Sequence, residues 1–518
     1  MLRKRIAAAF TVTAVAATMI AVAPAANAAA PKVLRIGSAV DVTMPFDPYA
    51  MSDGHYRPIM ATAYDSLIKV RPNYSGYDPD LATKWVWKGN KALVLTLRKG
   101  VKFTDGTAFN ANVVKANLDR VVVNHYPGPR SGSLNNVDSV KVLGPYSVQI
   151  NLKSPDNQLL LWLSLNMGYM VSPKAIATAD KTGNLTALLT ATDGTGPYML
   201  DWSKSTKGSR YTFVRNPNYW LKGAALKKAY PWDEVDYGIY TNATARANAL
   251  RSGDVDMAQV GNFDMPAVSN AGFAVKTWDV DVMRLALTDR NGDNNKALGD
   301  VRVRQALNYA INRDQFGAFG DPTSQSFPKG VDAFNPSWDN YYKYNPTKAK
   351  QLLAAAGYAN GLSINVAGLA DPTFAAIAQI VQNDLKAVGV TLNITNESMA
   401  SYFSAIALPK YNGYFFPYGA ASVPSVVNDL FGPGKVRLNG LGESDPKIMS
   451  LLDTYLAASK PKALKADGQA VGKYALENAL EVPLERPTYY YAYNPKVIKG
   501  LVFTVGNVMP SIQGYLPK

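Results

Sequence analysis

Hydrophobic residues alternate with polar ones along several short stretches of the chain, which is the pattern of half-buried β-strands. Residues 32–40 predict a buried strand near the N-terminus, and two prolines interrupt the pattern soon afterwards. Alternating tryptophans and leucines on either side of a Gly89–Asn90 turn predict a β-hairpin over 84–103. The first part of the chain is therefore expected to contain sheet.

Helical spacing dominates further along the chain. Residues 111–123 predict a helix, and Asp300 is placed to cap another one whose apolar residues recur every three or four positions. Asn345 and Asp371 each stand directly before a proline, which predicts two more capped helix starts, and Gly357 predicts a helix end. These helices alternate with strands and no linker separates them, so we expect an α/β protein whose domains are crossed more than once by the chain.

A glycine turn at 193–197 raises the possibility of a phosphate site. Phosphate-binding glycine loops open directly onto a helix N-terminus or end in a Gly-Lys-Ser/Thr step. Here the second glycine meets a proline, and the segments that follow, 198–202 and 210–216, have the composition of strands. The sequence therefore predicts a backbone turn and no anion site.

Composition sets the scale of the molecule. The chain has 518 residues, of which 47% are hydrophobic and 18% charged, so two or three domains are expected. The formal charge is +15, but lysine and arginine are scattered singly and never form a block. A nucleic-acid binder is expected to cluster them on one face. We therefore expect no nucleic-acid partner and a diffuse basic surface suited to anionic envelope polymers.

The first 28 residues have the features of a secretory signal peptide. Three basic residues precede an apolar run over 6–24, and Ala-Asn-Ala at 26–28 supplies a cleavage site. The chain contains no cysteine, which removes thiol chemistry and a lipid-attachment residue. We expect cleavage after Ala28 and a secreted protein in the periplasm or cell-wall space, without a lipid anchor.

No catalytic or metal-binding motif emerges. The two histidines, His55 and His125, lie in unlike contexts, and neither a G-x-S-x-G nor an H-E-x-x-H pattern is present. Residues 289–300 weakly resemble a calcium loop, but Asn294 replaces the required glycine and Asp300 is better used as a helix cap. We expect no enzyme activity, no metal and no cofactor.

Aromatic residues are abundant, with 30 Tyr, 17 Phe and 8 Trp. They gather in 411–421 and in 488–495, where large rings carry polar tips. Such side chains suit a ligand cleft because they bury area and still offer hydrogen bonds. The residues alone thus indicate an exported, multi-domain α/β binding protein.

Nine segments, in order, resemble the family 5 extracellular solute-binding proteins of ABC importers, the oligopeptide and dipeptide receptor family. They span nearly the whole mature chain. They are 46–49, 63–70, 77–87, 95–114, 194–200 with 214–220, 247–260, 300–316, 345–361 and 377–394.

The resemblance implies an α/β, two-lobed periplasmic-binding-protein fold with a two-strand hinge (type II, cluster C) and an extra inserted domain. Lobe one is expected to comprise 31–70, 191–280 and 487–518, the extra domain 71–190, and lobe two 281–486. The crossings are expected near 282–288 and 484–491. The lobes would close on a ligand by hinge motion and present it to an ABC permease and ATPase complex. We expect the receptor to act as a monomer.

The resemblance also implies where the ligand lies. Strand 413–420 is expected to line the cleft with Phe415, Phe416 and Tyr418, each through its ring or its backbone. Lobe one would face that strand through three residues that precede the segment 46–49. These are Val40, Thr43 and Met44.

The sequence departs from the family pattern at one place. Peptide receptors of this family carry an aspartate shortly before an acid–proline step, and here that position falls near Ala420, while Val423 precedes the proline. An ammonium buried without a carboxylate is costly, so free amino termini are disfavoured unless Asp429 or Asp41 takes part. An oligopeptide stays the first expectation. The alternatives are a carbohydrate or another uncharged-terminus solute, an envelope protein without a transport role, and a secreted hydrolase.

Overall fold

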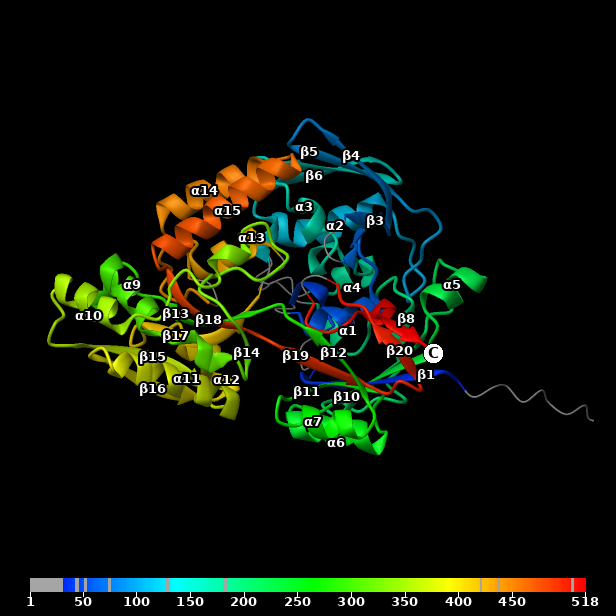
Figure 1. Ribbon diagram of the computed structural model, residues 1–518. Helices are drawn as coiled ribbons and strands as arrows, with labels where there is room; N and C mark the ends of the chain where they lie inside the picture. Colours follow the sequence, from blue (N-terminus) through cyan, green and yellow to red (C-terminus); the bar gives the residue numbers. More distant parts are fainter. Residues whose placement is uncertain are drawn as a thin grey trace, which may run out of the picture.

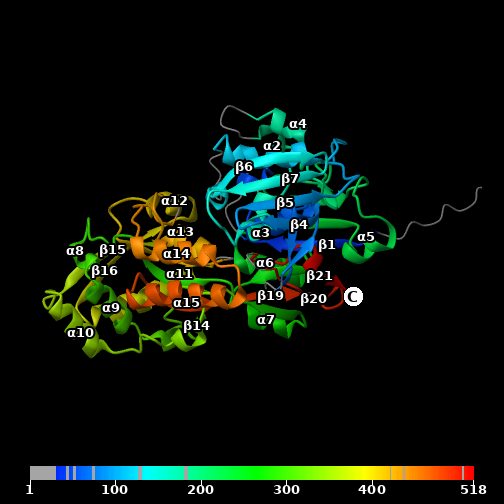
Figure 2. The same cartoon turned by 90° about the horizontal axis from the view of Figure 1, so that it is seen from above.

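The computed structural model describes residues 31–41, 46–50, 54–72, 76–125, 131–179, 185–419, 422–435, 438–504 and 507–518. The expected signal peptide lies outside these residues. The described chain contains three larger sheets with helices packed against them (Figures 1 and 2).

The first sheet has seven strands in the order β12-β19-β11-β1-β10-β9-β8. Strand β1 runs parallel to both of its neighbours, β10 and β11. Helix α1 covers one face, and helices α6 and α7 cover the other (Figure 1). The elements are β1 (Val33–Ser38), α1 (Tyr56–Ala63), β8 (Tyr198–Leu200), β9 (Arg210–Arg215), α5 (Gly223–Ala229), β10 (Glu234–Ile239), α6 (Ala243–Ser252), β11 (Met257–Val260), α7 (Met265–Asn270), β12 (Ala274–Trp278) and β19 (Tyr489–Tyr493).

The second sheet has six strands in the order β14-β18-β13-β17-β15-β16, and β15 runs parallel to β16 and β17. One face packs on α9, α10 and α11, and the opposite face packs on α12 to α15. The elements are β13 (Val282–Leu287), α8 (Lys296–Gly299), α9 (Val301–Ala310), β14 (Gly320–Pro322), α10 (Pro346–Ala355), β15 (Leu362–Leu369), α11 (Pro372–Lys386), β16 (Val390–Glu397), α12 (Met399–Ala405), β17 (Gly413–Tyr418), α13 (Val423–Leu430), α14 (Pro446–Ala457), α15 (Pro461–Glu477) and β18 (Glu481–Pro487).

A four-stranded antiparallel sheet, β4-β5-β7-β6, forms a third layer with its own apolar core (Figure 2). Its elements are β4 (Ala82–Lys88), β5 (Ala92–Leu97), α2 (Ala111–Val122), β6 (Val137–Gly144), β7 (Ser147–Leu152), α3 (Leu159–Trp162) and α4 (Pro173–Ala177). Two small hairpins, β2–β3 (Ile68–Val70 and Tyr77–Pro79) and β20–β21 (Ile498–Leu501 and Tyr515–Pro517), flank the larger sheets. We keep the names lobe one, extra domain and lobe two for the predicted segments, whose boundaries stay a prediction.

The local sequence signals are confirmed. The expected hairpin is β4–β5, and the expected helix at 111–123 is α2. The Asp300 carboxylate accepts a bond from the Arg302 amide at 2.8 Å, and the Asn345 side chain accepts one from Lys348 at 2.9 Å. Both helices therefore begin where their capping residues predict.

The chain crosses between the lobe-one sheet and the lobe-two sheet twice, at two neighbouring places. The chain leaves β12 and enters β13 through residues 279–281, and it returns from β18 to β19 through Thr488. Trp278 pairs with Tyr489 on one side of this crossing, and Met283 pairs with Glu485 on the other. This arrangement is the expected two-strand hinge.

The glycine turn at 193–197 packs against the end of α1. The Gly196 amide donates to the Ala63 carbonyl at 2.9 Å. A Cβ on Gly194 would lie 2.2 Å from the Ala63 oxygen, and one on Gly196 would lie 2.3 Å from the Ala63 carbonyl carbon. The glycines are therefore required by close backbone packing, in agreement with the predicted turn.

Candidate ligand-binding site

Parallel strands in both lobes define where a ligand is expected. Open α/β sheets bind ligands outside the carboxyl ends of their parallel strands. In lobe one β1 ends at Ser38, and in lobe two β17 ends at Tyr418. A ligand is therefore expected beside the hinge, at the segments that follow these two strands.

The three predicted aromatic residues of β17 point to opposite faces of the sheet because strand side chains alternate. Phe415 is fully buried in the core on the α9–α11 side. Phe416 is half-buried on the other side, where its ring stacks on Tyr402 of α12 at 5.8 Å and meets Phe403 edge-on at 5.3 Å. Phe415 can therefore offer a ligand only its backbone.

Tyr418 ends β17 on the same side as Phe416 and is 8% exposed. Its hydroxyl donates to the Asp429 carboxylate, and its carbonyl accepts a bond from the Arg284 guanidinium at 2.8 Å. The ring contributes to the core of lobe two as well as to its edge. A ligand contact by Phe416 or Tyr418 stays a prediction.

The lobe-one side begins with a tight turn after β1. The Ser38 hydroxyl donates to the Val40 carbonyl at 2.8 Å, and the half-buried Val40 side chain follows. Asp41 accepts a bond from the Tyr211 hydroxyl at 3.0 Å, which holds this carboxylate against lobe one. The predicted residues Thr43, Met44 and Ala420 lie outside the described residues.

One acidic residue of this region, Asp281, was not singled out by any pattern in the sequence. Asp281 lies in the first hinge crossing, is half-buried and accepts a bond from the Tyr489 hydroxyl. A Cβ on Gly419 would lie 2.4 Å from its Oδ1, so the carboxylate touches the carboxyl end of β17. Desolvation raises the pKa of Asp281, while the Tyr489 hydrogen bond and the charge of His55 lower it. Asp281 is thus a carboxylate beside the position where the family pattern places an aspartate.

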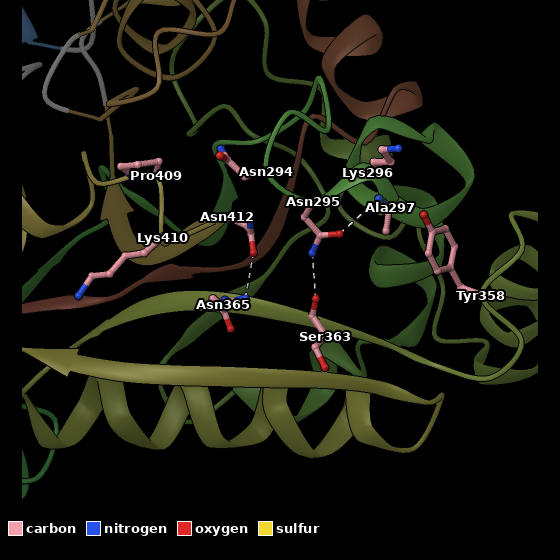
Figure 3. Close-up of a pocket in the computed structure, with 10 residues that line it drawn as sticks. All are labelled: Asn294, Asn295, Lys296, Ala297, Tyr358, Ser363, Asn365, Pro409, Lys410 and Asn412. Carbon is pink, nitrogen blue, oxygen red and sulfur yellow. Dashed lines mark hydrogen bonds between the residues drawn. The ribbon is translucent and has the colours of Figure 1, made fainter.

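A groove of about 520 Å³ lies elsewhere on lobe two, near the amino end of β15 (Figure 3). Three of its four asparagines, Asn295, Asn365 and Asn412, form side-chain hydrogen bonds with other protein groups. Asn295 donates to the Ser363 carbonyl at 2.8 Å, and the Asn412 oxygen accepts from the Asn365 amide at 3.1 Å. The side chains that line the groove therefore serve to hold loop ends together. The groove lies at the amino end of β15, whereas the ligand is expected at the carboxyl end of the parallel strand β17.

The described residues contain neither a metal-ligand cluster nor a membrane-spanning helix. No group of histidine, aspartate or glutamate in that part of the chain is arranged to hold a metal ion. Within the same residues, no helix combines the length and apolar character that crossing a membrane requires. Asp300, at the end of the weak calcium-like loop, caps α9 instead.

Residues 76–431 match the model of the bacterial extracellular solute-binding proteins, family 5. The match covers more than half of the chain and includes β17, the first hinge crossing and all but the first five residues of the predicted extra domain. The chain therefore belongs to this family of binding proteins, as its sequence segments predict.

Comparison with known proteins identifies the fold. The glutathione-binding protein GsiB of Salmonella choleraesuis (strain SC-B67) is 29% identical over 367 residues, which are 67% of this chain and 66% of that protein. A dipeptide-binding protein from Pseudoalteromonas sp. SM9913, solved with Met-Leu, has a TM-score of 0.80 at 21% identity and covers 94% of this chain and 100% of its own. NikA of Brucella suis, solved with Fe(III)-EDTA, has a TM-score of 0.77 at 24% identity, with coverages of 94% and 100%. The expected two-lobed α/β fold is confirmed, and the curated relative is matched over about two thirds of its length.

Proposed function

We propose that the protein is the extracytoplasmic receptor of an ABC importer that encloses its ligand, an oligopeptide, between two lobes and delivers it to the permease. The observation that carries this proposal is a two-strand hinge between two sheets in a chain of family 5. The names of the glutathione-binding relative and of the dipeptide-bound neighbour support a peptide ligand. Sugars and other solutes with an uncharged terminus are the second candidate, because Ala420 stands where an acid is expected.

The remaining parts of the proposal concern location and state. Residues 1–28 are removed on export, and the mature protein begins at about Ala29. The protein carries no lipid anchor, because the chain contains no cysteine to which a lipid could be attached. It acts as a monomer. It binds its ligand without changing it and takes no metal, cofactor or nucleic acid.

The first test is recovery of the ligand. Native mass spectrometry of protein purified from its host, followed by titration with the recovered compound, should show one ligand per chain. A ligand at 100 times its Kd should stabilise the protein by about 2.7 kcal/mol, and small-angle scattering should show a smaller radius of gyration. A chemically altered ligand would indicate a hydrolase, and an unchanged radius at saturation would contradict enclosure.

The second test asks which carboxylate receives a peptide ammonium. Asp281 beside Gly419 and Asp429 beside Tyr418 are the two candidates in lobe two. For the residue that binds the ammonium, substitution by asparagine should weaken binding of a free peptide at least tenfold, about 1.4 kcal/mol or more. The same peptide with an acetylated amino terminus should bind the variant and the wild type equally. Equal loss for both peptides would contradict ammonium recognition.

A further inference from the structure

The extra domain touches lobe two at a point remote from the hinge. The Asn157 amide nitrogen donates to the Leu456 carbonyl at 3.2 Å, and its side-chain amide donates to the carbonyls of Tyr455 at 2.5 Å and Ala458 at 3.3 Å. Gln158 donates to the Asn157 side-chain oxygen and to the Tyr455 hydroxyl. All three carbonyl acceptors lie at the C-terminal end of α14.

The chemistry of this contact is that of a helix cap. The last carbonyls of a helix have no partner within the helix and carry the negative end of its dipole. Asn157 supplies donors from both its backbone and its side chain to the carbonyls of Leu456 and Ala458, and it adds a second bond to the Tyr455 carbonyl, which also accepts from the Ala458 amide at 3.1 Å. The donors come from a different domain, which makes the cap of α14 conditional on how the domains are placed.

Both sides of the contact are held in position before they meet. The Asp156 carboxylate accepts a bond from the Gln158 backbone amide at 2.8 Å, and Asp156 itself is 8% exposed. On the other side, the Tyr455 hydroxyl bonds to Asp332 at 3.0 Å within lobe two. Neither surface has to be ordered by the contact, so little conformational entropy opposes its formation.

The covalent path between the two surfaces runs through the hinge. The segment around Asn157 follows β7 of the extra domain, and α14 belongs to lobe two, so the chain connects them only by way of lobe one and the first crossing at 279–281. Figure 1 shows α14 and α15 reaching toward the layer formed by α3 and β6. A rotation about the hinge must therefore make or break this cap.

We propose that Asn157 and Gln158 form a closure latch, a cap on α14 that is made when the lobes close and replaced by water when they open. The latch adds a second point of contact, away from the hinge, and biases the protein toward the closed state. Its role in ligand retention rests on the proposed receptor function, whereas its effect on domain placement does not.

The test uses the absence of cysteine from the chain. Spin labels on Lys88→Cys in β4 and Lys462→Cys in α15, both at exposed positions, report the distance between extra domain and lobe two without ligand. Asn157→Asp removes the side-chain donors and places a negative charge at the helix end, so it should shift the distances to longer values. Asn124→Asp makes the same change at an exposed position of the extra domain and should leave them unchanged.

Ligand kinetics provide the second readout. The peptide used is one that binds the wild type. It should dissociate about tenfold faster from Asn157→Asp, because loss of the latch raises the population of the open state, from which the ligand leaves. Gln158→Ala should show a smaller change in the same direction, and circular dichroism should show unaltered melting for both. Equal distance distributions in Asn157→Asp and Asn124→Asp would overturn the latch. If the wild type binds no peptide but Asn157→Asp still lengthens the distances, the result would overturn the peptide function alone.

Discussion

Gly196→Ala is expected to destabilise the protein by about 3 kcal/mol or more, because the new methyl group has no space. It would lie 2.3 to 2.6 Å from backbone atoms of Ala63 and Tyr64. Backbone cannot move aside as the end of a flexible side chain can, and overpacking a dense site costs about 1–3 kcal/mol and occasionally more. The shift needed to relieve the clash would also weaken the bond from the Gly196 amide to Ala63.

Urea unfolding of Gly196→Ala and Gly144→Ala measures this effect. A Cβ added to Gly144 would meet no heavy atom within 4 Å, and the backbone there is not left-handed, so this substitution should change the unfolding free energy by about 0.5 kcal/mol or less. Equal stabilities of the two variants would show that the turn at 193–197 is not tightly packed. The turn would then have to be explained by something other than close approach to α1.

Elements whose signals lie close together in the sequence could be predicted. Asp300, Asn345 and Asp371 cap the helices they precede, and the Gly89–Asn90 turn joins β4 to β5. Capping and tight turns are decided by residues within a few positions of one another, so one sequence is enough to predict them.

The order of strands in the sheets could not be predicted from such patterns. Strand β1 pairs with β10, about 200 residues away, and β19 enters between β11 and β12 from near the C-terminal end. The family resemblance implied the two-lobed fold and the two-strand hinge, but no strand order. Hydrophobic alternation shows that a strand is buried, but it does not show which strand lies beside it.

The same limitation applies to the candidate site. Alternation in β17 separates Phe415 from Phe416, but it does not reveal which of them faces the core of α9 to α11. Asp281 approaches Gly419 because Val282 of β13 pairs with Tyr418 of β17, and Asp281 and Gly419 are the next residues beyond that pair. The two strands are far apart in the sequence. Asn157 is likewise an ordinary polar residue until the domains place it on α14.

The second large effect concerns pH and the hinge. Glu485 lies on β18 at 0% exposure, and neither of its carboxylate oxygens has a hydrogen-bond partner within the described chain. Burial and the negative charge of Asp281 raise its pKa to about 8, with smaller raising contributions from Asp279 and Asp321 and a lowering one from Arg486. The folded protein therefore keeps this carboxyl protonated at neutral pH.

The sign of the pH dependence follows from that proton. An unfolded chain releases it near the ordinary glutamate pKa of 4.5, while the folded chain holds it until about pH 8. Between these values the folded state binds more protons, so the free energy of unfolding falls as the pH rises, by up to about 1.4 kcal/mol per pH unit. Across the window the loss from Glu485 is on the order of 5 kcal/mol.

Glu485→Gln keeps the shape of the side chain and removes the proton, so it should flatten the decline in unfolding free energy between pH 5 and 8 and stabilise the protein at pH 8. Glu477→Gln, at an exposed position of α15, serves as the matched control and should retain the wild-type slope. Asp281, whose pKa is also raised, should leave a residual decline in Glu485→Gln. Because Asp281 lies in the first hinge crossing and Glu485 lies on β18 just before the second, ionisation of both adds repulsion between the segments that carry the lobe motion. Identical pH profiles for Glu485→Gln and Glu477→Gln would contradict this assignment and show that Glu485 is ionised in the folded protein.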